Sequence, residues 1–133
     1  MSAARFDVRV YYEDTDFSGV VYHASYLRFM ERGRTEMLRS LGLSQGAIMA
    51  GQAGEVFGFA VRAMNVEFLK PARMDDLLTI ETTPRALGGA SLELDQRVLR
   101  GEEVLITAQV RIACVANGRP ARIPTAVREA LGG

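Results

Sequence analysis

Near the start of the chain, apolar and polar side chains first alternate and then repeat at helical spacing. Apolar side chains fall at every second position over residues 6–12, with Asp7 and Arg9 between them, which is typical of a half-buried strand. Over residues 24–41 the apolar positions recur every three or four residues, as on one face of a helix. Gly42 follows directly, and glycine favours the left-handed conformation that ends many helices. The pattern predicts one strand followed by one long helix.

Further along the chain, the pattern predicts mainly β-structure. A break in alternation at Ala63 and Met64 indicates a β-bulge. Glycines at 88–89 and 101 separate successive runs, as hairpin connections do. Together these features predict an α+β fold, in which an antiparallel sheet covers its apolar face with the long helix. The four further strands are expected over residues 57–68, 78–82, 92–98 and 104–114, and short helical turns over 44–51 and 125–131.

The composition restricts the classes of partner and site. The 133 residues carry 16 basic and 16 acidic side chains, so we expect no binding to nucleic acid, which needs excess positive charge. One Cys and one His cannot form an internal disulfide or a His/Cys zinc site, and we expect no metal and no cofactor. The charged N-terminus and the absence of a long apolar run favour a cytoplasmic protein without an integral membrane segment. One domain over residues 1–133 is the simplest interpretation.

The densest group of chemically active side chains lies between the first strand and the helix. Glu13, Asp14 and Asp16 place three carboxylates within four positions, and the only histidine, His23, stands where the helix begins. One interpretation is a solvated acidic turn in which Thr15 or Asp16 caps backbone amides. The alternative is a reactive site, because the unpaired N–H groups of a helix start can stabilise a carbonyl oxygen that gains negative charge. The apolar residues 20–22 predict partial burial of a nearby carboxylate, which would raise the pKa of Asp16.

The residues around this turn resemble a known family. The stretch 12–26, which contains Asp-Thr-Asp-x-x-Gly-x-Val-Tyr-His, and its continuation over 31–38 are similar to the signature of hotdog-fold acyl-CoA thioesterases. A second match covers residues 65–72 and 75–80. The resemblance is to the 4-hydroxybenzoyl-CoA thioesterase-like branch, and within it to the Tol-Pal-associated acyl-CoA thioesterases. It spans about residues 6–115 and implies the hotdog fold, a five-stranded antiparallel sheet wrapped around one long central helix.

The resemblance also implies roles for individual residues. The catalytic aspartate of the family falls on Asp16, which acts either as a nucleophile or as a general base that activates water. The amide that polarises the carbonyl falls on the backbone of His23, whose side chain either orients the reactants or only caps the loop. Glu31 is a further candidate, although an ion pair with Arg28 or Arg34 would explain it equally well. The candidates for substrate binding, including contacts to coenzyme A phosphates, are Tyr22, Glu31, Lys70, Arg73 and Arg85.

The predicted function is therefore hydrolysis of an acyl-CoA thioester, or of an acyl-carrier-protein thioester, to free acid and thiol. One alternative is a hotdog hydratase or dehydratase with His23 as the base. Another is a non-catalytic module that binds acyl thioesters. The predicted sheet has an open edge, and the resemblance implies that two sheets join in a homodimer or homotetramer with sites at the interface.

Overall fold

The structure is a computed structural model that describes residues 3–43 and 57–132. The long helix α1 and five strands account for most of these residues, and a short 3-10 helix, η1, precedes α1. The predicted turn over 44–51 lies outside the described residues. The elements are β1 (Ala4–Arg9), η1 (Tyr12–Asp14), α1 (His23–Ser40), β2 (Gly58–Phe68), β3 (Leu77–Leu87), β4 (Ser91–Arg100), β5 (Glu103–Ala116), β6 (Arg119–Pro120) and α3 (Thr125–Ala130).

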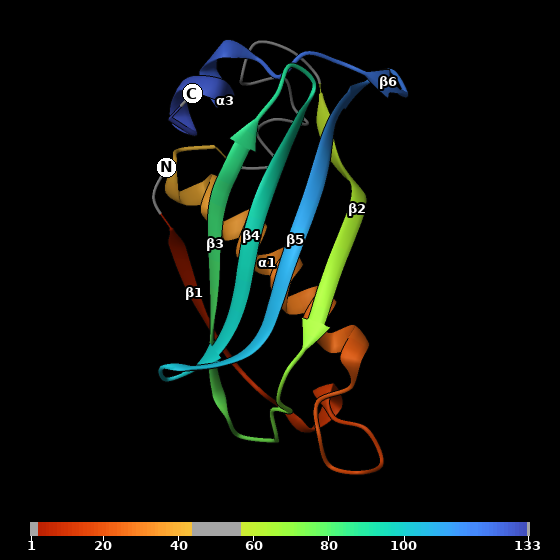
Figure 1. The fold of residues 1–133 in the computed structure, drawn as a ribbon, viewed down its shortest axis with the longest axis vertical. Coiled ribbons are helices and arrows are strands. Elements are labelled where there is room, and N and C mark those ends of the chain that lie inside the picture. Colours follow the sequence, from red (N-terminus) through yellow and green to blue (C-terminus); the bar gives the residue numbers. More distant parts are fainter. Residues whose placement is uncertain (1–2, 44–56, 133) are drawn as a thin grey trace.

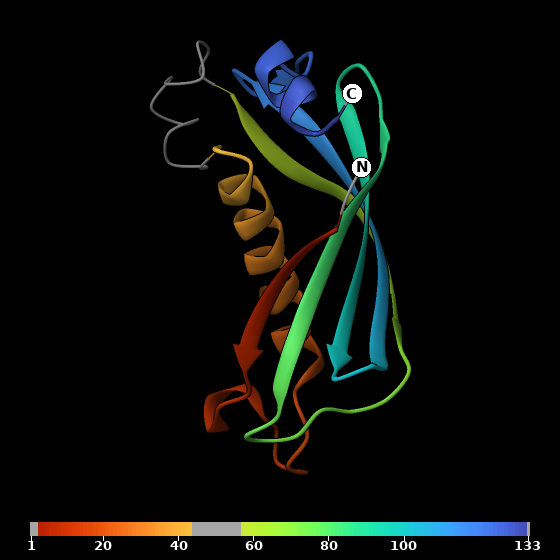
Figure 2. The same ribbon diagram turned by 90° about the vertical axis from the view of Figure 1, so that its left-hand side faces the viewer.

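The strands form one antiparallel sheet in the order β1-β3-β4-β5-β2, and the two-residue strand β6 pairs with the end of β5. Helix α1 crosses behind the sheet in Figure 1, and Figure 2 shows that it lies against one face only. The predicted α+β arrangement of an antiparallel sheet around one long helix is therefore confirmed. Strands β1 and β2 form the two long edges of the sheet.

Helix α1 buries the face that its sequence spacing predicts. Its buried residues are Ser25, Tyr26, Phe29, Met30, Gly33, Met37 and Leu38. Gly33 permits the closest approach to the sheet, since a Cβ atom at this position would lie 2.6 Å from Cγ2 of Ile80 on β3. After the helix, Gly42 has a φ of +81°, as expected for the residue that ends it.

A bulge in β2 keeps apolar side chains on the helix side of the sheet along the whole strand. The register shifts between Val61 and Ala63, close to the predicted break. Before the shift, Val61 pairs with Ile112; after it, Met64 pairs with Val110. Ile112 and Val110 are both buried on the helix side, so Val61 and Met64 opposite them also point toward the helix. The extra residue between Val61 and Ala63 therefore moves the inward positions of β2 from odd to even numbers.

Two predicted strand boundaries differ from the structure. Strand β1 ends at Arg9 rather than at residue 12, because the backbone N–H of Tyr11 donates to Oδ2 of Asp14 and the chain enters η1. Strand β3 extends to Leu87, well beyond the predicted end at residue 82. Its additional residues include Pro84, which is tolerated because β1 pairs with β3 only as far as Thr82 and leaves that side of the strand free.

Candidate active site

The motif between β1 and α1 folds into a small hairpin. Thr15 pairs with Val21, and the N–H of Asp16 donates to the carbonyl of Val20 at 2.9 Å. The turn closes through the N–H of Gly19, which donates to the carbonyl of Asp16 at 3.0 Å. Gly19 has a φ of +84°, a conformation that glycine adopts without strain. The hairpin therefore presents Asp16 at the start of a tight turn with Phe17 fully exposed at its tip.

The two oxygens of the Asp16 carboxylate differ. Oδ1 accepts hydrogen bonds from the hydroxyl of Ser18 at 2.6 Å and from its backbone N–H at 2.9 Å. Oδ2 accepts none from the described residues. The Ser18 hydroxyl is the main reason that the pKa of Asp16 lies below its ordinary value. The predicted rise in this pKa is wrong, because Val21 packs into the core while the hairpin tip carries Asp16 outward into solvent.

The start of α1 leaves two backbone donors free beside this hairpin. The N–H of Tyr22 donates to the carbonyl of Asp14, and that of Ser25 donates to Tyr22. Between them, the N–H groups of His23 and Ala24 have no acceptor within residues 3–43 and 57–132. Free N–H groups at the positive end of a helix dipole are suited to hold an oxygen that becomes negatively charged.

The first aspartate of the motif is structural. Asp14 is buried and its carboxylate accepts the N–H of Tyr11 at 2.8 Å. Its carbonyl also accepts the hydroxyl of Ser25 at 3.1 Å, and the same hydroxyl accepts a hydrogen bond from Arg28 at 2.8 Å. These bonds join the hairpin to the first turn of α1. The capping interpretation of the acidic turn also fits Asp16 in part, because its Oδ1 accepts the backbone N–H of Ser18, while no described residue donates to its Oδ2.

Aromatic rings form the wall next to the helix start. The His23 ring lies 4.3 Å from the Tyr22 ring and 6.3 Å from the Phe68 ring, measured between centroids. Phe68, at the end of β2, is half-exposed and also contacts Tyr26. The hydroxyl of Tyr26 accepts the N–H of Ala72 at 2.9 Å, and burial raises its pKa. Sequence reasoning missed Phe68, although the matched stretch 65–72 contains it.

Of the predicted cations, the structure brings two near the motif. Arg73 pairs through its backbone with Val20 of the hairpin. Lys70 follows Phe68 by two residues and forms an ion pair with Glu103 at 2.8 Å. Arg85 is not brought to the site within one chain. It lies near the other end of β3, about 25 Å from Leu77 at the rise of an extended strand, and pairs with Glu93 and Asp95.

Glu31 lies two turns along α1 from His23. In the part of the chain that the structure describes, it forms no ion pair with Arg28 or Arg34, which bond to Ser25 and Gln96 instead. Its side chain borders a cavity between α1 and the sheet. No group of three His, Cys, Asp or Glu residues among the described positions is arranged to hold a metal ion. None of the described helices is both long and apolar enough to cross a lipid bilayer.

A curved antiparallel sheet around one helix, with a carboxylate hairpin fixed at the helix start, defines a hotdog-fold protein with a site suited to acyl transfer. Comparison with known proteins agrees. The chain is 48% identical over 126 residues to the acyl-CoA thioester hydrolase YbgC of Escherichia coli O157:H7, covering 92% of this chain and 91% of that protein. It is 42% identical to the acyl-CoA thioesterase YbgC of Haemophilus influenzae, covering 95% and 92%. The solved structure of a probable thioesterase from Bartonella henselae is 48% identical, with a TM-score of 0.89 over 92% of this chain and all of that one.

Residues 18–107 match the family model of the thioesterase superfamily. The chain belongs to this superfamily.

Proposed function

We propose that the protein hydrolyses acyl-CoA thioesters to free acid and coenzyme A, with Asp16 and the first amides of α1 as the reacting site. The relatives at 42–48% identity are named for this reaction. One observation carries the assignment of residues: a carboxylate with a free oxygen and two free backbone donors occur at the same end of α1. The oxygen is Oδ2 of Asp16, and the donors are the N–H groups of His23 and Ala24, which have no acceptor among the described residues.

In the proposed mechanism, the thioester carbonyl oxygen accepts hydrogen bonds from the free N–H groups of His23 and Ala24. The helix dipole stabilises the negative charge that this oxygen gains as the carbonyl carbon is attacked. Asp16 is ionised at neutral pH, as exposed aspartates ordinarily are, and the hydrogen bond from the Ser18 hydroxyl lowers its pKa further. Its Oδ2 either attacks the carbon and expels the thiolate, leaving a mixed anhydride that water then cleaves, or takes a proton from the water that attacks. Mass spectrometry of rapidly quenched protein distinguishes the routes, because only the first adds an acyl group to the chain.

Replacing Asp16 by asparagine tests the assignment. We expect turnover of short, long and aromatic acyl-CoAs to fall by at least about two orders of magnitude, as for loss of an essential acid–base or nucleophilic group. Thiol release measured with a disulfide reagent gives the rate. Asp7→Asn is the matched control, since Asp7 lies on β1 and its exposed carboxylate accepts the Thr79 hydroxyl and no other side-chain hydrogen bond from the described residues. Asp16→Asn with parental turnover would contradict the proposal.

His23→Ala separates the backbone from the side chain. The variant keeps its N–H group, so only a modest loss is expected if the backbone alone polarises the carbonyl. A loss as large as that of Asp16→Asn would instead give the imidazole a direct part, as the hydratase alternative requires. Absence of thiol release from every acyl-CoA and acyl-carrier-protein thioester tested with the parent protein would favour the non-catalytic binding module.

The site is proposed to be completed by a second copy of the chain. Strand β2 is an edge of the sheet, 11 residues long, and among the described strands it pairs with β5 alone. A long edge strand is a template for pairing with another chain, and Phe68 at its end stands half-exposed beside His23. Lys70 and Arg73 follow this edge strand and are proposed to meet the coenzyme A phosphates. Sedimentation equilibrium should give a dimer or tetramer, and a monomer at assay concentrations would contradict this part of the proposal. A cytoplasmic location is testable by cell fractionation.

A further inference from the structure

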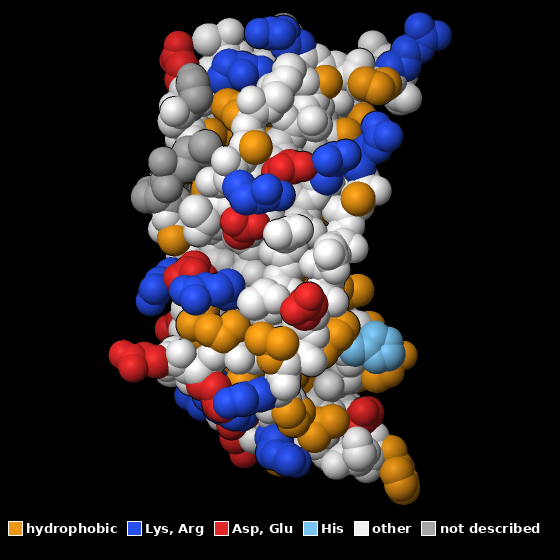
Figure 3. All heavy atoms as spheres, in the orientation of Figure 1, with side chains coloured by type: hydrophobic (Ala, Val, Ile, Leu, Met, Phe, Trp, Pro, Cys, Tyr) orange, Lys and Arg blue, Asp and Glu red, His pale blue; other side chains and the backbone are white. Residues whose placement is uncertain are grey.

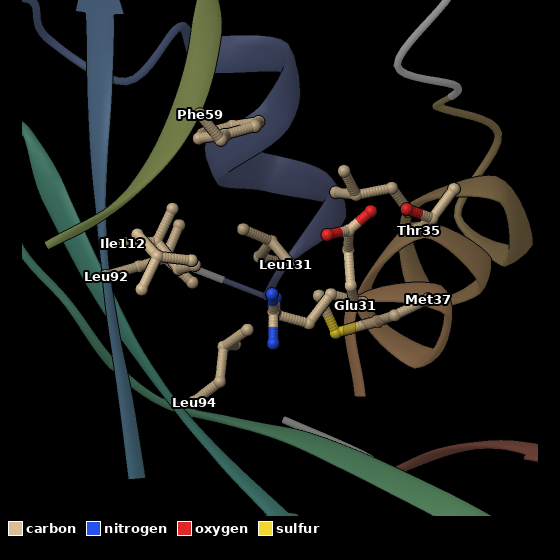
Figure 4. A pocket seen from close by; sticks show the side chains of 11 residues that line it. Glu31, Thr35, Met37, Phe59, Leu92, Leu94, Ile112 and Leu131 are labelled. Carbon is tan, nitrogen blue, oxygen red and sulfur yellow. The ribbon is translucent and has the colours of Figure 1, made fainter. Parts of the chain in front are cut away.

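A second feature of the molecule is a cavity of about 490 Å³ between α1 and the helix-facing side of the sheet. Figure 4 shows that Phe59, Leu92, Leu94 and Ile112 of the sheet face Glu31, Thr35 and Met37 of the helix across it, with Leu131 between them. The volume is in the range of small-molecule sites, which are mostly apolar with a few fixed polar groups. Here the wall contributed by β2, β4, β5 and the end of the chain is entirely apolar, with the residues Phe59, Val61, Leu92, Leu94, Ile112 and Leu131.

The polar group fixed in this cavity is the guanidinium of Arg34. It donates from Nη1 to Oε1 of Gln96 at 3.0 Å. Gln96 is itself buried, and its Nε2 donates to the carbonyl of Met30 and to the hydroxyl of Thr82, both at 2.9 Å. The amide of Gln96 therefore has one orientation, and this orientation directs its oxygen at Arg34.

Arg34 is also a partly desolvated cation that makes no direct ion pair with a described residue, although the nearby carboxylate of Glu31 favours its charged form. Burial lowers its pKa, which means that the charged form has lost favourable contact with water. Among the described residues, no carboxylate lies within 4.0 Å of its guanidinium, whereas Arg5, Arg97 and Arg100 each have one at 2.7–2.8 Å. A guanidinium offers five donors, of which one is used here.

We propose that this cavity binds an apolar chain that ends in a carboxylate, with the carboxylate on Arg34 and the hydrocarbon against the apolar wall. A guanidinium fork matches a carboxylate in two parallel hydrogen bonds, and the surrounding aliphatic and aromatic side chains match a hydrocarbon. Such a group has two sources. One is the free acid that thioester hydrolysis releases, and the other is the far end of a substrate acyl chain that carries a terminal carboxylate.

The position of Arg34 separates this site from the reacting carbonyl. Arg34 lies eleven residues after His23 on α1, about 16 Å along the helix axis. The cavity therefore meets either the end of a long acyl chain or a separate molecule. Glu31 is the other titratable residue among the described residues that line the cavity. Its carboxylate stands on the helix side in Figure 4 and opposes a bound anion, so its removal should strengthen binding.

Calorimetric titration of the full chain with octanoate and with 1-octanol tests the site without using activity. Octanoate should bind more tightly than 1-octanol, and Arg34→Met should weaken octanoate binding by at least about tenfold, as for loss of hydrogen bonds to a charged group. Glu31→Gln should tighten it. Arg32→Met, an exposed arginine on the same helix, is the matched control and should change nothing. Equal affinity for octanoate and octanol in the parent protein would overturn the proposal even if Arg34→Met failed to fold.

Kinetics distinguish the two sources. If the substrate chain supplies the carboxylate, a terminal-carboxylate acyl-CoA should lose at least about tenfold in kcat/KM in Arg34→Met relative to an alkyl acyl-CoA of the same length. If only the free acid binds, that ratio stays constant while octanoate still binds to the parent protein through Arg34. The kinetic test for a terminal carboxylate on the substrate depends on the proposed hydrolysis, but the octanoate titration does not. Octanoate binding by Asp16→Asn should equal that of the parent, so a failed hydrolysis proposal and a failed cavity proposal give different results.

Discussion

Replacing Gly33 by alanine tests how closely α1 is seated on the sheet. A Cβ atom at this position would lie 2.6 Å from Cγ2 of Ile80 and 3.2 Å from Oγ1 of Thr82. Carbon atoms in contact prefer about 3.5–4.0 Å, so the helix and β3 must separate by about 1 Å or distort. Ile80 is fully buried and its branched side chain cannot turn away. Overpacking of this kind costs about 1–3 kcal/mol, and alanine returns about 1 kcal/mol through its helix propensity.

We expect Gly33→Ala to lower the free energy of unfolding by up to about 2 kcal/mol, the difference between these two effects. The matched background is Ile80→Ala, which removes the clashing Cγ2 atom. There Gly33→Ala should be less unfavourable and can stabilise the protein by up to about 1 kcal/mol, because the contact at 2.6 Å is gone and only those at 3.2 Å to Oγ1 of Thr82 and 3.3 Å to the Cβ atom of residue 80 remain. Urea unfolding of the four proteins at one fixed protomer concentration gives the coupling free energy between the positions. Gly33→Ala that stabilises equally in both backgrounds would show that the contact is not tight.

Three further substitutions test the site and the sheet. Ser18→Ala should move the acid limb of the kcat/KM profile to higher pH, because the lost hydroxyl holds the pKa of Asp16 down and keeps the carboxylate ionised to lower pH; an unmoved limb would show that Asp16 does not set it. Ser25→Ala removes the hydrogen bond that joins the hairpin to α1, and it should lower kcat by about tenfold, as for loss of one strong hydrogen bond, with little effect on KM. Arg28→Ala leaves the bond from Ser25 to Asp14 intact and should lower kcat less. The Arg97 and Arg5 guanidinium groups lower the pKa of Glu81, so its contribution to stability is present above its unfolded-state pKa and is lost as pH falls through the folded one; urea midpoints should therefore fall less steeply with acidification in Glu81→Gln than in the parent.

The sequence pattern predicted the elements well where one periodicity dominates. Helix α1 and strands β2, β4 and β5 follow their apolar spacing to within two residues at each end. Strand β1 ended early because a single side chain, Asp14, offers the backbone of Tyr11 a bond that competes with pairing. A local contact of this kind leaves no trace in the periodicity.

The sequence predicted which residues form the candidate site, but it did not predict the surroundings that set their properties. Asp16 and His23 stand out through the motif, yet the pKa of Asp16 depends on which way the hairpin points. Its apolar neighbour Val21 is buried because its N–H donates to Ala72, more than fifty residues along the chain. Gln96 shows the same limit. It occupies a buried position of β4 between Leu94 and Val98, and only the contact between β4 and α1 shows that it orients Arg34.

The distribution of satisfied and unsatisfied groups supports the positions proposed for the ligand and the second chain. On the sheet face opposite α1, basic and acidic side chains lie next to one another (Figure 3). Ion pairs within the chain include Arg5–Glu81–Arg97 and Arg85–Glu93–Arg111. Exposed pairs of this kind contribute little free energy to folding, but they give these carboxylates and guanidinium groups partners within the chain. The free Oδ2 of Asp16, the N–H groups at the start of α1 and the unpaired edge of β2 lie instead where the end of β2 meets α1. Contact would give the unpaired backbone groups hydrogen-bond partners and would remove the half-exposed Phe68 ring from water. We therefore expect the substrate and the second chain to meet at this one corner of the fold.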